Sequence, residues 1–345
     1  MTGLRVVQWA TGNIGTRSLQ HVIEHPQLTL AGLYVTSPAK VGVDAGELCG
    51  LPPTGVAATS DIEEIFALHA DCVIYMPAAC DLDQVCGILA RGTNIVTTRG
   101  EFHHPGSMPA ADRERVEQAC SEGGTSIHST GSSPGFITEA IPLVLTSIQR
   151  RLDRLAINEY ADMSARNSPD MLFNLMGYGH PVEEFPPHRF AYAAQSFGPS
   201  MRLVADAIGM PLDAVTSTGE VAVTPEKLTI AAGTLDAGTV AGQRMIVTGT
   251  HHGRPLMTFT ATWCVSQDLD PAWSLRGAGW NGWNVRVDGD APLDIDVRFA
   301  IPEGRMGEMT PGYTANRAVN AVPYVCAALP GIRTTVDLPQ IIPVL

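Results

Sequence analysis

The stretch NIVTTRGEFHH (residues 94–104) contains the side chains best suited to proton chemistry. An apolar run over residues 94–98 is typical of a strand, and Glu101 follows shortly after it. Ligands of open α/β sheets bind at the carboxyl ends of the strands, so Glu101 is a candidate general base. The alternative is a solvated loop carboxylate. His103 and His104 could relay protons, but adjacent side chains of an extended loop point apart. We therefore expect no metal site here.

A second motif, VVQWATGNIG (residues 6–15), predicts a nucleotide site. Small residues at positions 10, 12 and 15 separate a strand-like run from a helical one. Such spacing lets the chain turn sharply, lets the backbone approach a pyrophosphate, and lets the helix pack on the strand. The helix N-terminus would add free N–H groups for the phosphates. The expected cofactor-binding residues are Ala10, Thr11, Gly12, Asn13, Ile14 and Gly15. The alternative is a purely structural turn.

The end of the second strand-like run, LYVTSPAK (residues 33–40), bears on the choice of cofactor. A carboxylate there would bind the ribose 2′-hydroxyl and repel a 2′-phosphate. The run has no acid, and Thr36, Ser37 and Lys40 can donate hydrogen bonds, with Arg17 near the same rim. We therefore predict that NADPH is preferred, with NAD as the alternative cofactor. An ordinary turn would also explain this segment.

Other residues are candidates for the nicotinamide and substrate ends of the site. In STGSSPGF (residues 129–136), Gly131 and Pro134 could bring the backbone against the nicotinamide, although a plain turn into a helix fits as well. Further cofactor contacts are expected at Pro77, Ala78 and Thr98. Phe136, Met171, Met176 and Tyr178 could wall an apolar pocket, or could simply be core. No cluster of arginines or acids is suited to a substrate carboxylate, which favours a short neutral ketone or aldehyde.

The elements that must position these residues alternate regularly in the first part of the chain. Strand-like apolar runs alternate with helical spacing, which predicts a parallel sheet wound by right-handed crossovers. The expected strands are residues 4–10, 28–35, 71–76, 94–98 and 125–131, and the expected helices are residues 13–25, 60–68, 82–92 and 109–124. This pattern is typical of an α/β Rossmann domain with a doubly wound sheet.

The pattern changes after residue 133. A long helix is expected over residues 132–152, a strand over 152–164, and helices over 170–179 and 200–210. Long alternating runs follow, with hairpin turns expected at residues 251–255 and 288–292, and a final helix at 314–331. We predict a Rossmann domain (1–133, rejoined by 308–345) and an α+β domain (134–307) with an antiparallel sheet.

Composition excludes several kinds of partner. The 345 residues carry a formal net charge of −13, with 22 basic and 35 acidic residues, and no basic stripe that would bind nucleic acid. No apolar run approaches the ~20 residues that span a bilayer. The first residues lack the features of a signal peptide, and the seven cysteines form no C-x-x-C pair. We expect reduced thiols and a cytoplasmic location.

Four motifs together resemble a known group of enzymes. VVQWATGNIG, VTTRGEFHHPG, SSPGFITEAIP and TANRAVNAVP resemble the dihydrodipicolinate reductase-like family of 2,4-diaminopentanoate dehydrogenase and the native amine dehydrogenases. The resemblance covers almost the whole chain. It implies a Rossmann domain, then an α+β domain whose sheet forms a homodimer, and a last helix that returns to the first domain.

The resemblance also implies a reaction. Members of this family carry out reversible NAD(P)-dependent deamination of amines, or amination of carbonyl compounds with ammonia, and Glu101 matches their catalytic glutamate. True dihydrodipicolinate reductases carry a histidine–histidine–lysine motif and a Ser-Gly-Thr turn, which EFHHPGSMP lacks. Two alternatives stay open: a reductase of carbonyls or imines that needs no ammonia, and an NADP-binding sensor without activity.

Overall fold

The chain forms two compact units. The computed structural model describes residues 3–185, 188–273, 281–302 and 304–345. One unit comprises Met1–Phe136 with Thr310–Leu345, and the other comprises Ile137–Met309. The domain boundaries predicted from the sequence lie at 133/134 and 307/308, and the structure divides the chain after Phe136 and after Met309.

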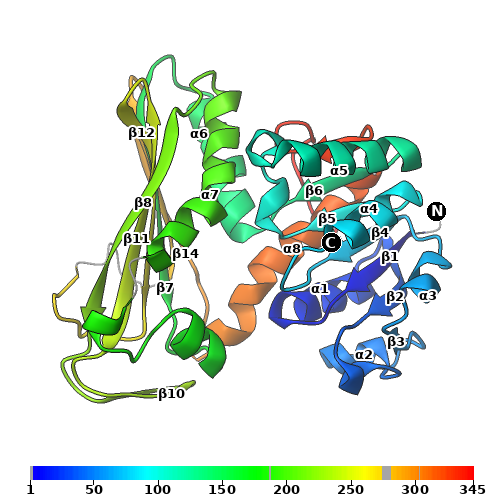
Figure 1. Cartoon of the computed structure of the whole chain (residues 1–345), viewed down its shortest axis with the longest axis horizontal. Coiled ribbons are helices and arrows are strands. Elements are labelled where there is room, and N and C mark those ends of the chain that lie inside the picture. Colours follow the sequence, from blue (N-terminus) through cyan, green and yellow to red (C-terminus); the bar gives the residue numbers. More distant parts are fainter. Residues whose placement is uncertain (1–2, 186–187, 274–280, 303) are drawn as a thin grey trace. The chain divides into compact units, whose positions relative to one another are not determined.

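The first unit is built on a parallel sheet (Figure 1). Its strand order is β15-β6-β5-β4-β1-β2-β3, and every pairing is parallel. The strands are β1 (Leu4–Trp9), β2 (Leu28–Tyr34), β3 (Ala58–Thr59), β4 (Cys72–Tyr75), β5 (Asn94–Thr97), β6 (Ser126–Ser129) and β15 (Gly331–Arg333). The order reverses between β1 and β4, and ligands of such sheets bind beyond the carboxyl ends of the strands at that point. The predicted Rossmann fold is confirmed.

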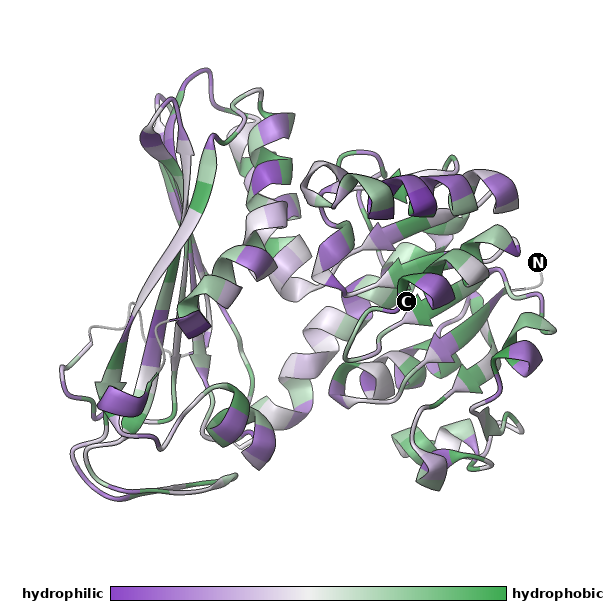
Figure 2. Cartoon of the chain, in the orientation of Figure 1, coloured by the Kyte–Doolittle hydropathy of each residue, from purple (hydrophilic) through white to green (hydrophobic). Residues whose placement is uncertain are grey.

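Helices cover both faces of this sheet. They are α1 (Asn13–Glu24), α2 (Ala45–Cys49), α3 (Ile62–Phe66), α4 (Leu82–Ala90), α5 (Ala110–Gly123) and α8 (Met306–Cys326). Ile74 of β4 packs in one core cluster with α1 and α8, and Val73 packs in another with α4 and α5. Figure 2 shows apolar residues along the central strands and hydrophilic residues along α5. Within the described residues, no helix has the length and apolar content to cross a lipid bilayer.

The second unit is built on a six-stranded sheet in the order β14-β13-β7-β12-β11-β8. The strands are β7 (Leu152–Asp162), β8 (Ala214–Val223), β11 (Val240–His251), β12 (Arg254–Cys264), β13 (Gly282–Gly289) and β14 (Leu293–Arg298), and β9 (Leu228–Ile230) pairs separately with β10 (Gly233–Leu235). Helices α6 (Ile141–Thr146) and α7 (His188–Ala207) pack on one face, where Phe197 stacks on Phe259.

This sheet is mixed rather than wholly antiparallel, because β7 and β12 run parallel. The chain leaves β7 and crosses to the far edge strand β8 by way of α7, so β8 runs in the same direction as β7. Two hairpin reversals then give β12 that direction too. Alternation within a strand does not reveal the direction of its neighbour, which is why the sequence analysis missed the parallel pair. The two predicted hairpins, β11–β12 and β13–β14, are confirmed.

The long helix predicted over residues 132–152 is wrong. The backbone is not helical at Ser133, Pro134 and Gly135, and α6 covers only Ile141–Thr146. Gly135 has φ +119°, and a Cβ there would lie 3.0 Å from Thr130 Oγ1. A glycine in this conformation ends the loop that follows β6 and lets the chain turn into the second unit's first helix.

The cysteines are all free thiols. Burial raises the pKa of Cys120 and of Cys264 to about 12. A thiol that stays protonated at neutral pH is a poor nucleophile, so these cysteines act as small apolar core residues.

Candidate functional site

The glycine turn joins β1 to α1 at the point where the strand order reverses. Gly12 caps α1 without a side-chain hydrogen bond, and a Cβ added there would meet nothing within 4 Å. A Cβ at Gly15 would lie 2.3 Å from the backbone oxygen of Ala10, so only glycine lets α1 pack this close. Space at Gly12 and contact at Gly15 are what a pyrophosphate-binding turn requires. These residues fit a dinucleotide.

Ala10 occupies a conformation that favours glycine. Its φ is +72°, a region that costs a residue with a Cβ about 1–2 kcal/mol. The buried side chain of Gln8 stabilises the turn by donating from Nε2 to the Ala10 oxygen at 2.9 Å. Gln8 was not predicted as a site residue. Its signal in the sequence is a polar side chain within the apolar run VVQWA.

Lys40 links the exit of β2 to the glycine turn. Its Nζ donates to the backbone oxygen of Thr11 at 2.8 Å and to Thr11 Oγ1 at 2.9 Å. Thr36 is exposed, while Ser37 and Arg17 are partly buried. The structure therefore brings the predicted Lys40 to the predicted Thr11 and holds an ammonium group beside the turn.

The other turn residues contribute in different ways. Asn13 is exposed at the start of α1, whereas Ile14 packs against the core cluster of α1 and α8. Ile14 would therefore contact a ligand mainly through its backbone. Thr11 is 8% exposed and accepts from the Thr16 hydroxyl through its backbone oxygen at 3.2 Å.

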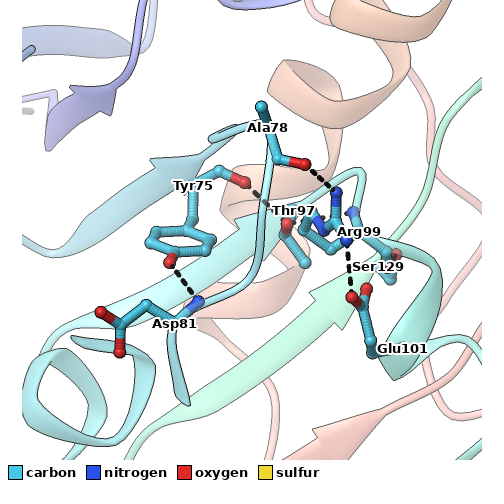
Figure 3. Close-up of polar contacts among 7 residues, drawn as sticks. All are labelled: Tyr75, Ala78, Asp81, Thr97, Arg99, Glu101 and Ser129. Carbon is cyan, nitrogen blue, oxygen red and sulfur yellow. Dashed lines mark hydrogen bonds and ion pairs between the residues drawn. The ribbon is translucent and has the colours of Figure 1, made fainter. Parts of the chain in front are cut away.

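Glu101 lies beyond the carboxyl end of β5, in the short 3-10 helix Gly100–Phe102 (Figure 3). Its side chain is 41% exposed, and Oε1 lies 2.6 Å from Nη2 of Arg99. Phe102 and His103 next to it are buried, with 0% and 1% exposure. These two buried side chains anchor the loop, and they leave the carboxylate at the rim of the sheet.

Hydrogen bonds around Arg99 connect the carboxyl ends of β4, β5 and β6 (Figure 3). Its Nη1 donates to the backbone oxygen of Ala78 at 2.7 Å, and its backbone oxygen accepts from the Ser129 hydroxyl at 2.6 Å. Thr97 accepts from the Arg99 N–H and donates to the oxygen of Tyr75 at 2.6 Å. The ends of β4, β5 and β6 are thereby locked around Glu101. Arg99 stands within the motif that pointed to Glu101, but its own role was not predicted.

The cysteine beside Glu101 is inert. Burial, followed by the charge of Glu101, raises the pKa of Cys80 to about 11. Pro77 is partly buried and Ala78 exposed in the same segment after β4, and Thr98 is partly buried after β5. These predicted residues line the edge from which Glu101 emerges.

The loop after β6 contains polar atoms suited to a ligand. Thr130 Oγ1 and Ser133 Oγ are buried, and neither has a hydrogen-bond partner among the described residues. The hydroxyls of Ser132 and Thr314 lie 2.7 Å apart. A Cβ at Gly131 would lie 3.1 Å from the backbone oxygen of Pro134. Two unsatisfied hydroxyls beside the strand ends are consistent with a bound amide group.

The residues proposed to wall the substrate pocket lie in both units. Phe136 belongs to the first unit, with the guanidinium of Arg317 5.5 Å from the centre of its ring. Met171, Met176 and Tyr178 pack in a core cluster of the second unit. Tyr178 is wholly buried, and its hydroxyl donates to the oxygen of Trp263 at 2.9 Å. Their packing is that of core residues, and their contact with substrate stays a prediction.

A carboxylate held by two tryptophans in the second unit was not predicted. Glu159 of β7 accepts from the indole N–H groups of Trp263, at 3.0 Å, and Trp283, at 2.9 Å. Strands β12 and β13 flank β7, so residues far apart in sequence meet there. No local pattern in the sequence reveals such a pairing.

Comparisons with known proteins agree with this architecture. Two family models match: the 2,4-diaminopentanoate dehydrogenase C-terminal domain over residues 136–344, and the dihydrodipicolinate reductase N-terminus over residues 6–97. An amine dehydrogenase of Streptomyces virginiae is 30% identical over 349 residues, which cover 97% of this chain and 96% of the relative. A 2,4-diaminopentanoate dehydrogenase of Acetoanaerobium sticklandii is 24% identical over 261 residues, which cover 74% of this chain and 69% of the relative.

A solved structure shares the fold. The amine dehydrogenase from Mycobacterium smegmatis has a TM-score of 0.78 and 21% identity to this chain, with 98% of this chain and 97% of that chain covered. The resemblance seen in the motifs is thus confirmed. The chain belongs to the family of 2,4-diaminopentanoate dehydrogenase and the amine dehydrogenases, and it is an NAD(P)-dependent oxidoreductase.

Proposed function

We propose that the protein is an amine dehydrogenase that aminates small aliphatic ketones or aldehydes reversibly, with ammonia and NADPH. The observation that carries this proposal is the carboxylate of Glu101. It stands at the carboxyl edge of β5, held by Arg99, on the same sheet edge as the glycine turn. Named relatives are amine dehydrogenases, which supports the same chemistry.

The cofactor would be held along this edge. The N–H groups at the start of α1 and the open space at Gly12 suit the pyrophosphate. Lys40, with Thr36, Ser37 and Arg17, would hold the 2′-phosphate of NADPH, and no carboxylate stands there to oppose it. The hydroxyls of Thr130 and Ser133 suit the carboxamide of the nicotinamide. When bound, the nicotinamide supplies or accepts the hydride at C4.

Glu101 would act twice in the amination. Its carboxylate takes a proton from ammonium, and the freed ammonia attacks the carbonyl carbon of the substrate. The resulting carbinolamine loses hydroxide as water, with a proton returned from Glu101. The product is a cationic iminium, which the carboxylate then stabilises until hydride reaches its carbon. The ion pair with Arg99 holds the carboxylate in place through these steps.

The substrate is proposed to be short and uncharged. The sequence offers no cluster of cations for a substrate carboxylate, and the apolar substrate contacts of Phe136, Met171, Met176 and Tyr178 stay predictions. We also place the enzyme in the cytoplasm, where its seven free thiols would stay reduced.

The test is NADPH oxidation with a panel of short ketones and aldehydes, with and without ammonium. Oxidation that requires both ammonium and the carbonyl compound supports the proposal. Equal oxidation without ammonium would identify a carbonyl reductase instead. Tight NADPH binding without oxidation by any carbonyl compound would identify a sensor.

A further inference from the structure

A cavity of about 620 Å³ lies in the first unit at the C-terminal end of α1, away from the proposed catalytic edge. Twelve residues of α1 separate its wall at His25 from the glycine turn, a length of about 18 Å at 1.5 Å per residue. The volume is within the range of small-molecule sites. The proposed amination makes no use of this cavity.

The wall of the cavity is mostly apolar. The turn after α8 contributes Ala327 and Leu329, and the C-terminal segment contributes Pro339, Ile342 and Val344. Leu329 is 77% exposed and Ile342 is 58% exposed. Exposed large apolar side chains gathered around a cavity indicate a surface that binds an apolar group. The hydroxyl of Tyr324 fixes the C-terminal segment here through hydrogen bonds with the backbone N–H and oxygen of Ile342, both 3.1 Å.

The two charged residues of the wall, one of each sign, form hydrogen bonds with the protein itself. Arg333 donates from Nε to the oxygen of Leu329 at 2.7 Å, and from Nη2 to the oxygen of Pro330. Asp337 accepts from the N–H and the hydroxyl of Thr334, at 2.8 and 2.7 Å. With one cation and one anion the wall has no net charge, so a charged ligand would lose its hydration without a net electrostatic gain.

His25 supplies a hydrogen-bond donor to the cavity. It is 5% exposed, and its Nδ1 accepts from the backbone N–H of Gln27 at 3.1 Å. The proton of the neutral ring is therefore on Nε2, and among the described residues nothing accepts from it. Burial lowers the pKa of His25, which keeps the ring neutral at neutral pH. The ligand atom that faces this nitrogen must be an acceptor.

We propose that this cavity is a second small-molecule site, which binds a neutral amphiphile. An ester, amide or alcohol oxygen accepts from His25, and a medium-length alkyl chain lies against Ala327, Leu329 and Ile342. The proposal does not depend on the reaction that the protein catalyses.

Competition binding tests it. N-phenyl-1-naphthylamine, an uncharged fluorescent probe, is titrated into the full chain and displaced with methyl decanoate or with decanoate. The ester should compete at concentrations at least about tenfold lower than the anion, because the wall has no net positive charge and the anion must give up more hydration. His25→Phe should weaken the ester about fivefold, the effect of one hydrogen bond.

A pair of tryptophan variants serves as the steric test. Ala327→Trp places an indole in the cavity and should abolish probe binding, whereas Ala67→Trp, on the exposed end of α3, should leave it unchanged. NADPH binding and the unfolding temperature show that each variant is folded. Equal probe binding by both variants, no probe binding by the natural protein, or equal competition by ester and anion would overturn the proposal. The proposal would also fail if Ala327→Trp left probe binding unchanged and altered the mass measured by sedimentation. The cavity would then belong to an interface between subunits.

Discussion

At the residue scale, the proposed chemistry depends on the charge of Glu101. Glu101→Gln keeps the size of the side chain and removes its negative charge. We expect turnover to fall by about a hundredfold or more in both directions, the usual contribution of a placed general base. NADPH affinity, measured by fluorescence, should be unchanged, because the phosphate-binding residues lie elsewhere. Glu114→Gln, at an exposed position of α5, is the matched control. If Glu101→Gln kept most of its ammonium-dependent rate, Glu101 would not be the base.

Lys40 is the residue on which the expected preference for NADPH depends. Lys40→Ala should weaken NADPH more than NADH, since only NADPH carries the 2′-phosphate. We also expect a smaller loss of NADH affinity, because the turn would lose the two hydrogen bonds that Lys40 donates to Thr11.

The chain offers a direct comparison, since its other lysine is Lys227, 70% exposed at the side chain. NADPH should protect Lys40, and not Lys227, from an amine-reactive reagent followed by mass spectrometry. Equal losses of both cofactors in Lys40→Ala, together with no protection of Lys40, would mean that Lys40 does not contact the 2′-phosphate.

At the element scale, the two glycines at the junction of β1 and α1 are predicted to have different roles. Gly12 leaves space for the cofactor, and Gly15 lets α1 pack on the turn. Gly12→Ala should leave the unfolding free energy near that of the natural protein, because space surrounds the added methyl group. NADPH affinity should fall about tenfold or more, since the methyl group takes the place of the pyrophosphate. Gly15→Ala should instead destabilise the fold by about 1–3 kcal/mol through overpacking against Ala10. Urea unfolding and NADPH titration of both variants check this. Similar behaviour of the two would contradict it.

The C-terminal end of α1 makes stability depend on pH. Burial, and then the charge of His25, lowers the pKa of His21, while burial lowers that of His25. Because the pKa of each ring in the folded protein lies below the usual histidine pKa of 6.5, the unfolded chain takes up protons first as the pH falls. The unfolding free energy should therefore be constant above about pH 7 and should fall as the pH drops toward about 5. Urea unfolding at several pH values measures this slope.

A histidine variant isolates the cause. His25→Phe should flatten the slope, while His188→Gln, at an exposed position, should not. An unchanged slope in His25→Phe would assign the acid sensitivity to other groups.

At the scale of the whole molecule, we propose a homodimer formed through the second unit's sheet. Phe259 faces α7, so Thr258 and Thr260 point to the opposite face, as Thr218 and Thr248 do on neighbouring strands. Sedimentation equilibrium at micromolar concentration should give the dimer mass. The double substitution Thr258→Arg with Thr260→Arg should give monomers, because it would place four cations in one interface. Thr229→Arg, at an exposed position of β9, should leave the dimer intact. A monomeric natural protein would rule the dimer out.

Local signals in the sequence determined the Rossmann architecture, the position of the glycine turn and the location of Glu101 after a buried strand. Each of these features depends on residues close together in the sequence. They are the apolar runs that are buried on two faces, the start of α1 at Gly12, and the lack of a side chain at Gly15, where α1 packs against Ala10. The motifs also determined the family, since they lie over almost the whole chain.

Tertiary structure alone decided the rest. The parallel pairing of β7 and β12 and the short edge strands β3 and β15 depend on partners distant in sequence. The same holds for the contact of Lys40 with Thr11 and for the hydrogen bond from Arg99 to Ala78. A residue's type and spacing show what it can donate or accept. Which partner it meets depends on how the strands are ordered and how the crossovers bring their ends together.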